Sequence, residues 1–358
     1  MRGVRGLVRA GIGRAGSVRD GRRVLGPDED AFTLAATALE RARGPRFGDR
    51  TPVRVTVLGS LPPATDWAIS VVLERPVEVV RPVSGAEGFG RTLEEARAGL
   101  SGDAVVLAVV AGGAETASWD GVLPTADGER DDAAVAVWFG ERGAARSGEA
   151  LRVGDTAGGP LALASELYRT AVREGQDGSW AGPWSVPPPG GPTVEPSKFR
   201  ALADLRPTAV SEGAYVPRPR YLENLPSRWN FAAERCRTCG TTTFPSRGRC
   251  RSCGRAEGLE TVGLPTDGAL VVATTVIGSG AQPTEFDPQV GALGPYGVVL
   301  AEVAPGVRVT LQLTDASPGE VRIGDRVDTR LRRLYPMEGE WRYGRKAVPR
   351  RPPAGPTG

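Results

Sequence analysis

The chain has 358 residues, with no histidine and only four cysteines. Without histidine it cannot contain a Ser-His-Asp triad, a Cys-His dyad or a His-ligated zinc or haem. Its 45 basic residues, of which only Lys198 and Lys346 are lysines, are nearly balanced by 42 acidic residues, so the net charge of +3 does not by itself indicate nucleic-acid binding. The 49 glycines and 31 prolines favour short elements joined by many turns. The length suggests roughly two to three domains.

No stretch of the sequence has the roughly 18 apolar residues that a membrane-spanning helix needs. The opening MRGVRGLVRAGIGRAG has scattered arginines and no continuous apolar core, so it is a poor signal peptide. We therefore expect a soluble cytoplasmic protein with reduced thiols.

The first half of the chain alternates helical and strand patterns. Residues 28–43 predict a helix with Asp28 as its N-cap, an apolar stripe along one face, and a stop at Gly44. Further along, strands are expected at 53–59, 103–113 and 133–140, a valine-rich stretch at 68–80, and helices from Thr92 and over 161–175. This alternation predicts an α/β domain. The Pro/Gly-rich stretch 179–196 predicts a linker at a domain boundary.

All four cysteines lie within eighteen residues, in two CxxC motifs that are separated by ten residues and each followed by glycine: Cys236, Cys239, Cys250 and Cys253. Each motif presents two thiolates from one tight turn, and its glycine lets backbone amides approach the sulfurs. The pattern favours a structural zinc site with four cysteine ligands. Rubredoxin-like iron is the first alternative, and two disulfides, which a cytosolic chain and adjacent CxxC pairs disfavour, are the second. A closed four-cysteine site leaves no open position for a substrate, so we expect it to stabilise a small module.

The residues after the cysteines read as short strands, at 268–280, 295–303, 307–315, 321–327 and 328–336. Val307, Val309 and Leu311 alternate with polar residues, and Ala304–Pro305–Gly306 forms a hairpin turn between two strands. Four to five short strands in about 75 residues favour a small Greek-key barrel of the OB-fold type.

This C-terminal order is RWNFAAERCRTCG, FPSRGRCRSCG, VVATTVIG, GPYGVVLAEVAPGVRVTLQLTD, IGDRV, RLRRLYP and WRYGRKAVP. It resembles the zinc-ribbon plus OB-fold proteins associated with acyl-CoA enzymes, over roughly residues 199–350. The resemblance implies that this half accompanies a thiolase or hydroxymethylglutaryl-CoA (HMG-CoA) synthase as a non-catalytic partner or fused domain.

In the N-terminal half, RRVLGPDEDAFTLAATALERA, VTVLGSLPP, DAVVLAVVAGG, DDAAVAVWFGE and GDTAGGPLALASELYRTA resemble the HMG-CoA synthase branch of the thiolase superfamily. The cover is about residues 1–175, shorter than two full thiolase halves, which implies a degenerate copy. That family attacks acyl-CoA with a cysteine assisted by histidine. Here no cysteine precedes residue 236, and Ser84 lies near the nucleophile position. Ser84 would be a nucleophile only with an activating base, and none is identifiable; the alternative is a polar turn before a helix. We expect no catalytic residue.

Together these features predict a multidomain chain: a partial thiolase-like α/β domain, a rubredoxin-like zinc ribbon and an all-β OB-fold barrel. The expected boundaries are 1–178 for the thiolase-like domain, 179–198 for the linker, 199–230 for a helical or extended lead-in, 231–262 for the zinc ribbon, 263–337 for the OB-fold and 338–358 for a basic tail with a disordered end.

Two basic segments that carry aromatic residues, 227–256 and 330–351, flank the predicted barrel. The candidate ligand- or partner-binding residues in them are Arg228, Trp229, Phe244, Arg247, Arg333, Tyr335, Trp341, Arg342, Tyr343, Arg345 and Lys346. They could contact the phosphates and adenine of CoA or an acidic partner surface, bind single-stranded nucleic acid, or form a solvated arginine-rich surface. The loop 282–297, with Glu285 and Asp287, and the glycine-rich turn 154–159 are weaker candidates.

We therefore expect a non-catalytic acyl-CoA-binding or scaffolding partner of a thiolase or HMG-CoA synthase-type enzyme, with a structural zinc. A single-stranded nucleic-acid-binding protein and an acyltransferase with an unrecognised nucleophile are the alternatives. Acyl-CoA is a possible ligand, while neither nucleic acid nor a membrane is an expected partner.

Overall fold

The computed structural model describes residues 7–19, 22–43, 52–59, 61–81, 104–110, 133–139, 216–278, 290, 294–337 and 340–350. The chain divides into two compact units, one of Met1–Leu25 with Glu29–Pro189 and the other of Gly26–Asp28 with Gly190–Gly358. Three residues that precede the first long helix thus belong to the C-terminal unit. None of the helices in these ranges is long and apolar enough to cross a membrane. The domain boundaries expected from the sequence remain predictions.

The N-terminal unit is built on a five-stranded mixed sheet in the order β1-β7-β6-β4-β5. Its strands are β1 (Leu7–Arg14), β4 (Val53–Gly59), β5 (Val77–Val80), β6 (Ala104–Val110) and β7 (Ala133–Phe139). β4 runs parallel to β5 and β6, whereas β7 is antiparallel to β6 and β1. A short hairpin of β2 (Ser17–Arg19) and β3 (Arg22–Val24) follows β1. The parallel pairing of β4 with β5, which a helical segment (63–73) connects, and of β4 with β6 confirms the predicted α/β class.

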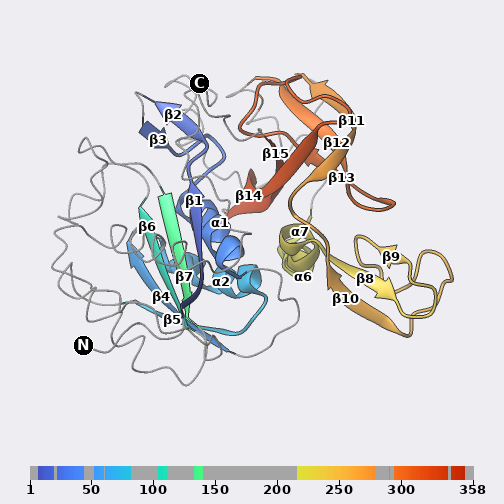
Figure 1. Ribbon diagram of the computed structural model, residues 1–358, viewed down its shortest axis with the longest axis horizontal. Coiled ribbons are helices and arrows are strands. Elements are labelled where there is room, and N and C mark those ends of the chain that lie inside the picture. The colour runs from blue at the N-terminus through green and yellow to red at the C-terminus, as the bar shows by residue number, and fades with distance from the viewer. Residues whose placement is uncertain are drawn as a thin grey trace. The chain divides into compact units, whose positions relative to one another are not determined.

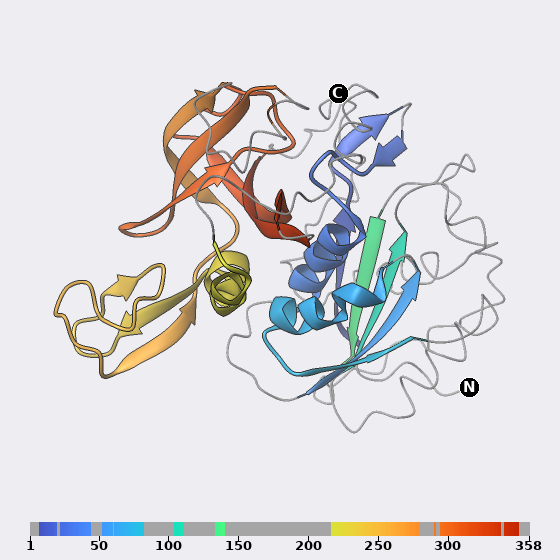
Figure 2. The same cartoon turned by 180° about the vertical axis from the view of Figure 1, so that it is seen from behind.

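Two helices, α1 (Ala31–Arg43) and α2 (Asp66–Leu73), lie on the same side of this sheet (Figures 1 and 2). α2 follows the 3-10 turn η1 (Pro63–Thr65). The valine-rich stretch 68–80 is thus part helix and part strand, because Glu74 at a φ of 56° ends α2 before β5 begins. The largely apolar α1 packs on β1, β6 and β7. A Cβ atom at Gly13 would lie 2.1 Å from the carbonyl oxygen of Leu34, so only glycine allows β1 and α1 to approach this closely.

The N-cap of α1 is Asp30, and the sequence prediction of Asp28 as the cap is wrong. The Thr33 backbone N–H donates to Oδ1 of Asp30 at 2.9 Å, and the Asp30 N–H donates to the Thr33 hydroxyl at 2.9 Å. This reciprocal pair satisfies amides that the first helical turn leaves without helical partners. The side chain of Asp28 makes its contacts in the C-terminal unit instead.

The C-terminal unit begins, within its described residues after 215, with two short helices, α6 (Arg218–Glu223) and α7 (Leu225–Asn230). A small antiparallel sheet follows, in the order β10-β8-β9, from β8 (Ala232–Cys236), β9 (Thr242–Thr243) and β10 (Leu259–Gly263). This sheet carries the cysteine motifs and is the predicted ribbon (Figure 1).

The last part of the unit is a five-stranded antiparallel sheet in the order β13-β12-β11-β14-β15. Its strands are β11 (Ala269–Ile277), β12 (Tyr296–Ala304), β13 (Val307–Gln312), β14 (Arg326–Met337) and β15 (Glu340–Pro349). The sheet curls until its two ends meet: Leu313 bridges to Ala347, and the Thr314 N–H donates to the Ala347 carbonyl at 2.9 Å. Register shifts in β11, β12 and β14 supply the bends that a small barrel needs. The predicted barrel is therefore confirmed as a nearly closed one.

The barrel core is made of alternating apolar residues of the strands, such as Val299, Ala301 and Val327, which are fully buried. The predicted turn at Ala304–Gly306 joins β12 to β13, with Gly306 at a φ of 70°. Residues 340–349, which the sequence interpretation assigned to a basic tail, form β15 and pair with β14. The charged residues of this segment do not show the apolar pattern of a buried strand. The long aliphatic stems of arginine and lysine can nevertheless be buried while their charged groups form ion pairs or hydrogen bonds.

Candidate functional site

The four cysteines come from two turns of the same shape. The Gly240 N–H donates to the Cys236 carbonyl at 2.8 Å, and the Gly254 N–H donates to the Cys250 carbonyl at 3.0 Å. Gly240 and Gly254 both have a φ of 72°, a conformation that favours glycine. This geometry is why each CxxC pair is followed by glycine, and it aims both thiols of each turn at the same point.

The sulfur positions fit one tetrahedral metal ion. All four Sγ atoms lie within 4.8 Å of one another. Sγ of Cys236 is 3.7 Å from Sγ of Cys253, and Sγ of Cys239 is 3.5 Å from Sγ of Cys250. Four sulfurs bound to zinc at about 2.3 Å stand about 3.8 Å apart. These two pairs each join one motif to the other, and all four cysteines are free of disulfides, so the donor set can hold a metal such as zinc.

The pKa values of the clustered thiols also favour the binding of a cation. Hydrogen bonds from the side chain and backbone of Thr241 lower the pKa of Cys239 to about 6. At Cys253, a backbone hydrogen bond from Arg255 favours the thiolate, but burial and the three neighbouring sulfurs outweigh it and raise the pKa to about 11. Neighbouring thiols therefore compete for protons, and a divalent cation would stabilise all four thiolates together.

Several of the predicted binding residues hold α6 and α7 to β15. The buried Trp229 donates its indole N–H to the Tyr343 carbonyl at 3.0 Å. The Tyr221 hydroxyl accepts from the Tyr343 N–H at 2.8 Å and donates to the Tyr343 carbonyl at 3.1 Å. The Arg342 guanidinium stacks on the Tyr221 ring at 4.7 Å and that of Arg228 at 5.9 Å. These side chains are thus engaged in packing within the unit.

A second set lies around the junction of ribbon and barrel. The Phe244 ring packs edge-on against the Phe231 ring, with centroids 5.6 Å apart. Arg345 is buried, lies 5.3 Å from the centroid of the Phe231 ring, and donates to the Thr329 hydroxyl at 3.3 Å. Arg247, in contrast, is exposed on a ribbon loop, where its backbone N–H donates to Glu234 at 3.1 Å. Whether any of them binds a ligand or partner stays a prediction.

The remaining predicted residues lie on β14 and β15. Arg333 stacks on Trp341 at 4.6 Å, and Tyr335 is buried. Lys346 is also buried, with its Nζ 2.8 Å from Oδ2 of Asp28. Their role as a CoA- or partner-binding surface is likewise still a prediction.

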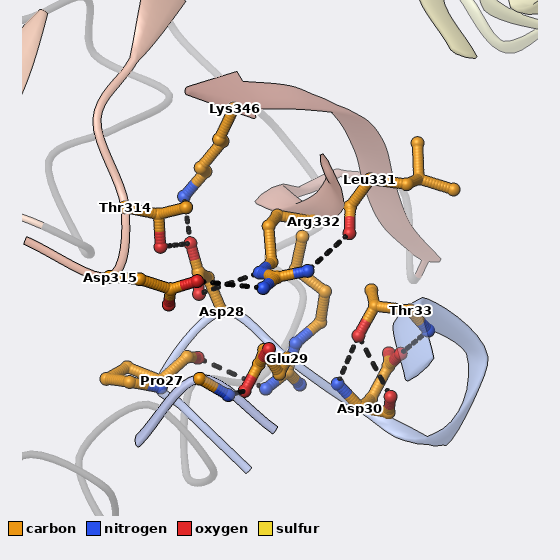
Figure 3. A network of polar contacts seen from close by, with 12 residues as sticks. Pro27, Asp28, Glu29, Asp30, Thr33, Thr314, Asp315, Leu331, Arg332 and Lys346 are labelled. Carbon is orange, nitrogen blue, oxygen red and sulfur yellow. Dashed lines mark hydrogen bonds and ion pairs between the residues drawn. The ribbon is translucent and has the colours of Figure 1, made fainter. Parts of the chain in front are cut away.

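A buried polar network surrounds Asp28, and no local sequence pattern predicts it. The Thr314 hydroxyl donates to Oδ2 of Asp28 at 2.9 Å, and Nε of Arg332 lies 3.9 Å from Oδ1 (Figure 3). Arg332 also binds Asp315, with its Nη2 3.0 Å from Oδ2. Burial acts to raise the pKa of Asp28, but Lys346 and then Arg332 outweigh it and hold that pKa below its ordinary value. Asp28 is therefore ionised in the folded protein at neutral pH.

Four of the weaker candidates lie outside the described residues. They are Ser84, the turn 154–159, and the loop residues Glu285 and Asp287.

A four-cysteine ribbon and a nearly closed five-stranded barrel in one unit define a class of two-part β modules.

Comparison with known proteins identifies the family of the chain, although no protein-family model matches it. A DUF35 domain-containing scaffold protein of Methanothermobacter thermautotrophicus is 32% identical over 133 residues, which cover 37% of this chain and 95% of that protein. One of the same description from Methanocaldococcus jannaschii is 31% identical over 132 residues, covering 36% and 89%. The chain belongs to the DUF35 domain-containing scaffold proteins.

Solved structures similar to the chain include the Ltp2-ChsH2(DUF35) aldolase, at 22% identity and a TM-score of 0.29, covering 38% of this chain and 98% of that one. They also include thiolase-like enzymes. The 3-oxoacyl-[acyl-carrier-protein] synthase III of Aquifex aeolicus matches at 13% identity and a TM-score of 0.25, covering 38% of this chain and 54% of that one. The synthase III of Thermus thermophilus matches at 18% and 0.27, covering 39% and 52%. The family assignment rests on the two scaffold proteins.

Proposed function

We propose that this chain is a non-catalytic scaffold that binds a thiolase or HMG-CoA synthase-type enzyme and helps to handle its acyl-CoA. The observation that carries the proposal is the match to two scaffold proteins over 95% and 89% of their own lengths. The resemblance of the C-terminal motifs to partners of acyl-CoA enzymes supplies the class of enzyme. The proposal places the protein in the cytoplasm, where its thiols stay reduced.

In this proposal the ribbon holds zinc at Cys236, Cys239, Cys250 and Cys253. Four thiolates fill the coordination shell, so the ion has no position for a substrate and serves the structure. The sequence supports a non-catalytic role for the N-terminal unit, because no cysteine precedes residue 236 and histidine is absent from the whole chain. All four thiols then belong to the metal, and none is left to attack a thioester.

Co-purification with a defined partner tests the proposal. The full chain would be co-expressed with a thiolase or HMG-CoA synthase-type enzyme of the same organism, and the mixture separated by size with light-scattering detection. We expect a complex of fixed stoichiometry, and acyl-CoA binding that calorimetry detects in the complex. Recovery of a lone protein that binds neither the enzyme nor acyl-CoA would refute the scaffold role.

The same preparation separates the scaffold from an acyltransferase. Incubation with radiolabelled acyl-CoA should leave no covalent label on this chain, whereas the partner enzyme with its cysteine nucleophile should be labelled. A stable label that survives denaturation of this chain would establish a nucleophile and contradict the proposal.

A further inference from the structure

The carboxylate of Asp28 lies in a site made by three side chains of the barrel. Thr314 follows β13, Arg332 lies on β14 and Lys346 on β15, and Figure 3 shows all three directed at the Asp28 carboxylate. The Thr314 hydroxyl and Nζ of Lys346 reach the same oxygen, at 2.9 and 2.8 Å, and Arg332 lies on the other side. A hydroxyl and two cations around one carboxylate make a complete recognition site for that group.

This site is buried from solvent. The exposed fraction of the side chain is 2% for Lys346, 4% for Arg332 and 10% for Asp28. An ammonium group in such a place needs a counter-ion, because burial removes the water that would otherwise stabilise its charge. Among the described residues, Asp28 supplies the carboxylate within ion-pair distance of Lys346. Arg332, in contrast, lies within ion-pair distance of two carboxylates, those of Asp28 and Asp315.

The barrel binds the backbone of the same segment as well. The Arg333 N–H donates to the Asp28 carbonyl at 2.9 Å, and the Arg333 guanidinium donates to the Pro27 carbonyl at 3.2 Å. Main-chain contacts to consecutive carbonyls together with one anchored side chain are how extended peptides are recognised. The segment Gly26–Asp28 thus has the contacts of a bound peptide, and it belongs to the C-terminal unit.

This contact is not contained in the part of the chain shared with the scaffold proteins. Thr314 and Asp28 are 286 residues apart, whereas the matched stretches are 133 and 132 residues long. No stretch of that length can include both the site and its carboxylate. The pairing is therefore a feature that this longer chain adds to the shared module.

We propose that Thr314, Arg332, Lys346 and the Arg333 backbone form a peptide-docking site of the barrel that recognises a carboxylate, and that Gly26–Asp28 is its ligand in the same chain. The two cations bind the acidic side chain, and Arg333 binds the carbonyls of Pro27 and Asp28. When Asp28 is truncated, the empty place should accept a small carboxylate such as formate. This holds whether or not the protein is a scaffold for an enzyme, and it is tested on the isolated full chain.

The test is chemical rescue of the Asp28→Gly variant by sodium formate. The melting temperature of the variant is measured by thermal unfolding in sodium formate and in sodium chloride at the same ionic strength. Loss of a buried ion-pair partner should lower the melting temperature by about 10 °C. Formate should raise it again along a saturable curve, and chloride should not. Asp30→Gly is the matched control: it removes a neighbouring carboxylate that caps α1, so its melting temperature should respond equally to formate and chloride.

A second variant shows that the response belongs to this site. In Asp28→Gly with Lys346→Met, the buried ammonium is gone, so the double variant should be more stable than Asp28→Gly alone and should lose the response to formate. If Asp28→Gly fails to fold, recovery of folding in the double variant tests the same charge requirement. A formate response of equal size in Asp28→Gly and Asp30→Gly, or one that persists without Lys346, would overturn the proposal. So would wild-type stability of Asp28→Gly, or a double variant no more stable than Asp28→Gly.

Discussion

The ribbon and the barrel belong to the same unit but are stabilised in different ways. The ribbon has strands of five, two and five residues, and two of its four cysteines, Cys239 and Cys253, are exposed. The barrel has strands of six to twelve residues around a continuous apolar core. A module with little apolar core needs a metal to hold it, whereas one with a full core can bury an ion pair beside it and still fold.

Removal of the metal should produce the largest difference in stability between the ribbon and the barrel. Chelation, or the substitution Cys253→Ser, should unfold the ribbon, since a structural zinc site contributes on the order of 10 kcal/mol to folding. Arg235 lies on β8 and pairs with Glu260 of β10, so trypsin should cut after Arg235 much faster once the metal is lost. The strands of the barrel should stay protected. Proteolysis followed by mass spectrometry measures both, and elemental analysis gives the expected one zinc per chain.

Ser246→Ala is the control for this experiment, because Ser246 is exposed in a loop of the same ribbon and is not a cysteine of the cluster. Its cleavage pattern and its metal content should match those of the native protein. Protein purified without metal, whose ribbon resists trypsin equally with and without chelator, would show that the four thiols do not depend on a cation.

The ribbon could be predicted from the sequence because its information is local. Cys236 and Cys253 lie seventeen positions apart, and the two CxxCG motifs contain every ligand and both glycines with a φ of 72°. The barrel could be predicted because alternation of apolar and polar residues, as in β13, reports which face of a strand is buried.

The Asp28 network and the strands β1 and β15 could not be predicted, because they depend on contacts with residues that are far away in the sequence. Asp28 looks like a helix cap since it precedes α1, and nothing nearby shows that Lys346 is its partner. Lys346 and Arg342 look like surface cations, and a basic segment hides β15, because burial of a long charged side chain depends on contacts that folding creates. Strand β1 was also missed, since its glycine-rich pattern is explained only by the close approach of α1 at Gly13.

The second prediction compares a buried ion pair with an exposed one on the same barrel. Lys346→Met leaves the Asp28 carboxylate buried without its closest cation, which should cost about 3–5 kcal/mol of unfolding free energy. Arg308→Met is the matched control: its partner Glu302 is 3.1 Å away, but the Arg308 side chain is 57% exposed, so the loss should stay below about 1 kcal/mol. Denaturant unfolding measures both variants. Equal losses of unfolding free energy in the two variants would mean that burial does not make the Lys346–Asp28 pair more important for stability than the exposed pair.

The smallest predicted effect separates two carboxylates that look alike in the sequence. Asp30→Ala removes the acceptor for the Thr33 N–H, so it should destabilise the start of α1 by about 1 kcal/mol. Hydrogen exchange of the Thr33 and Leu34 amides should then quicken roughly fivefold, since a factor of ten corresponds to about 1.4 kcal/mol. Exchange in β14 and β15 should not change, because Asp30 belongs to the N-terminal unit. Asp28→Asn should do the reverse: it should quicken exchange in β14 and β15 and leave the Asp30–Thr33 cap intact. If both variants changed the same amides, the two carboxylates would not serve separate units, and the assignment of Gly26–Asp28 to the barrel would be wrong.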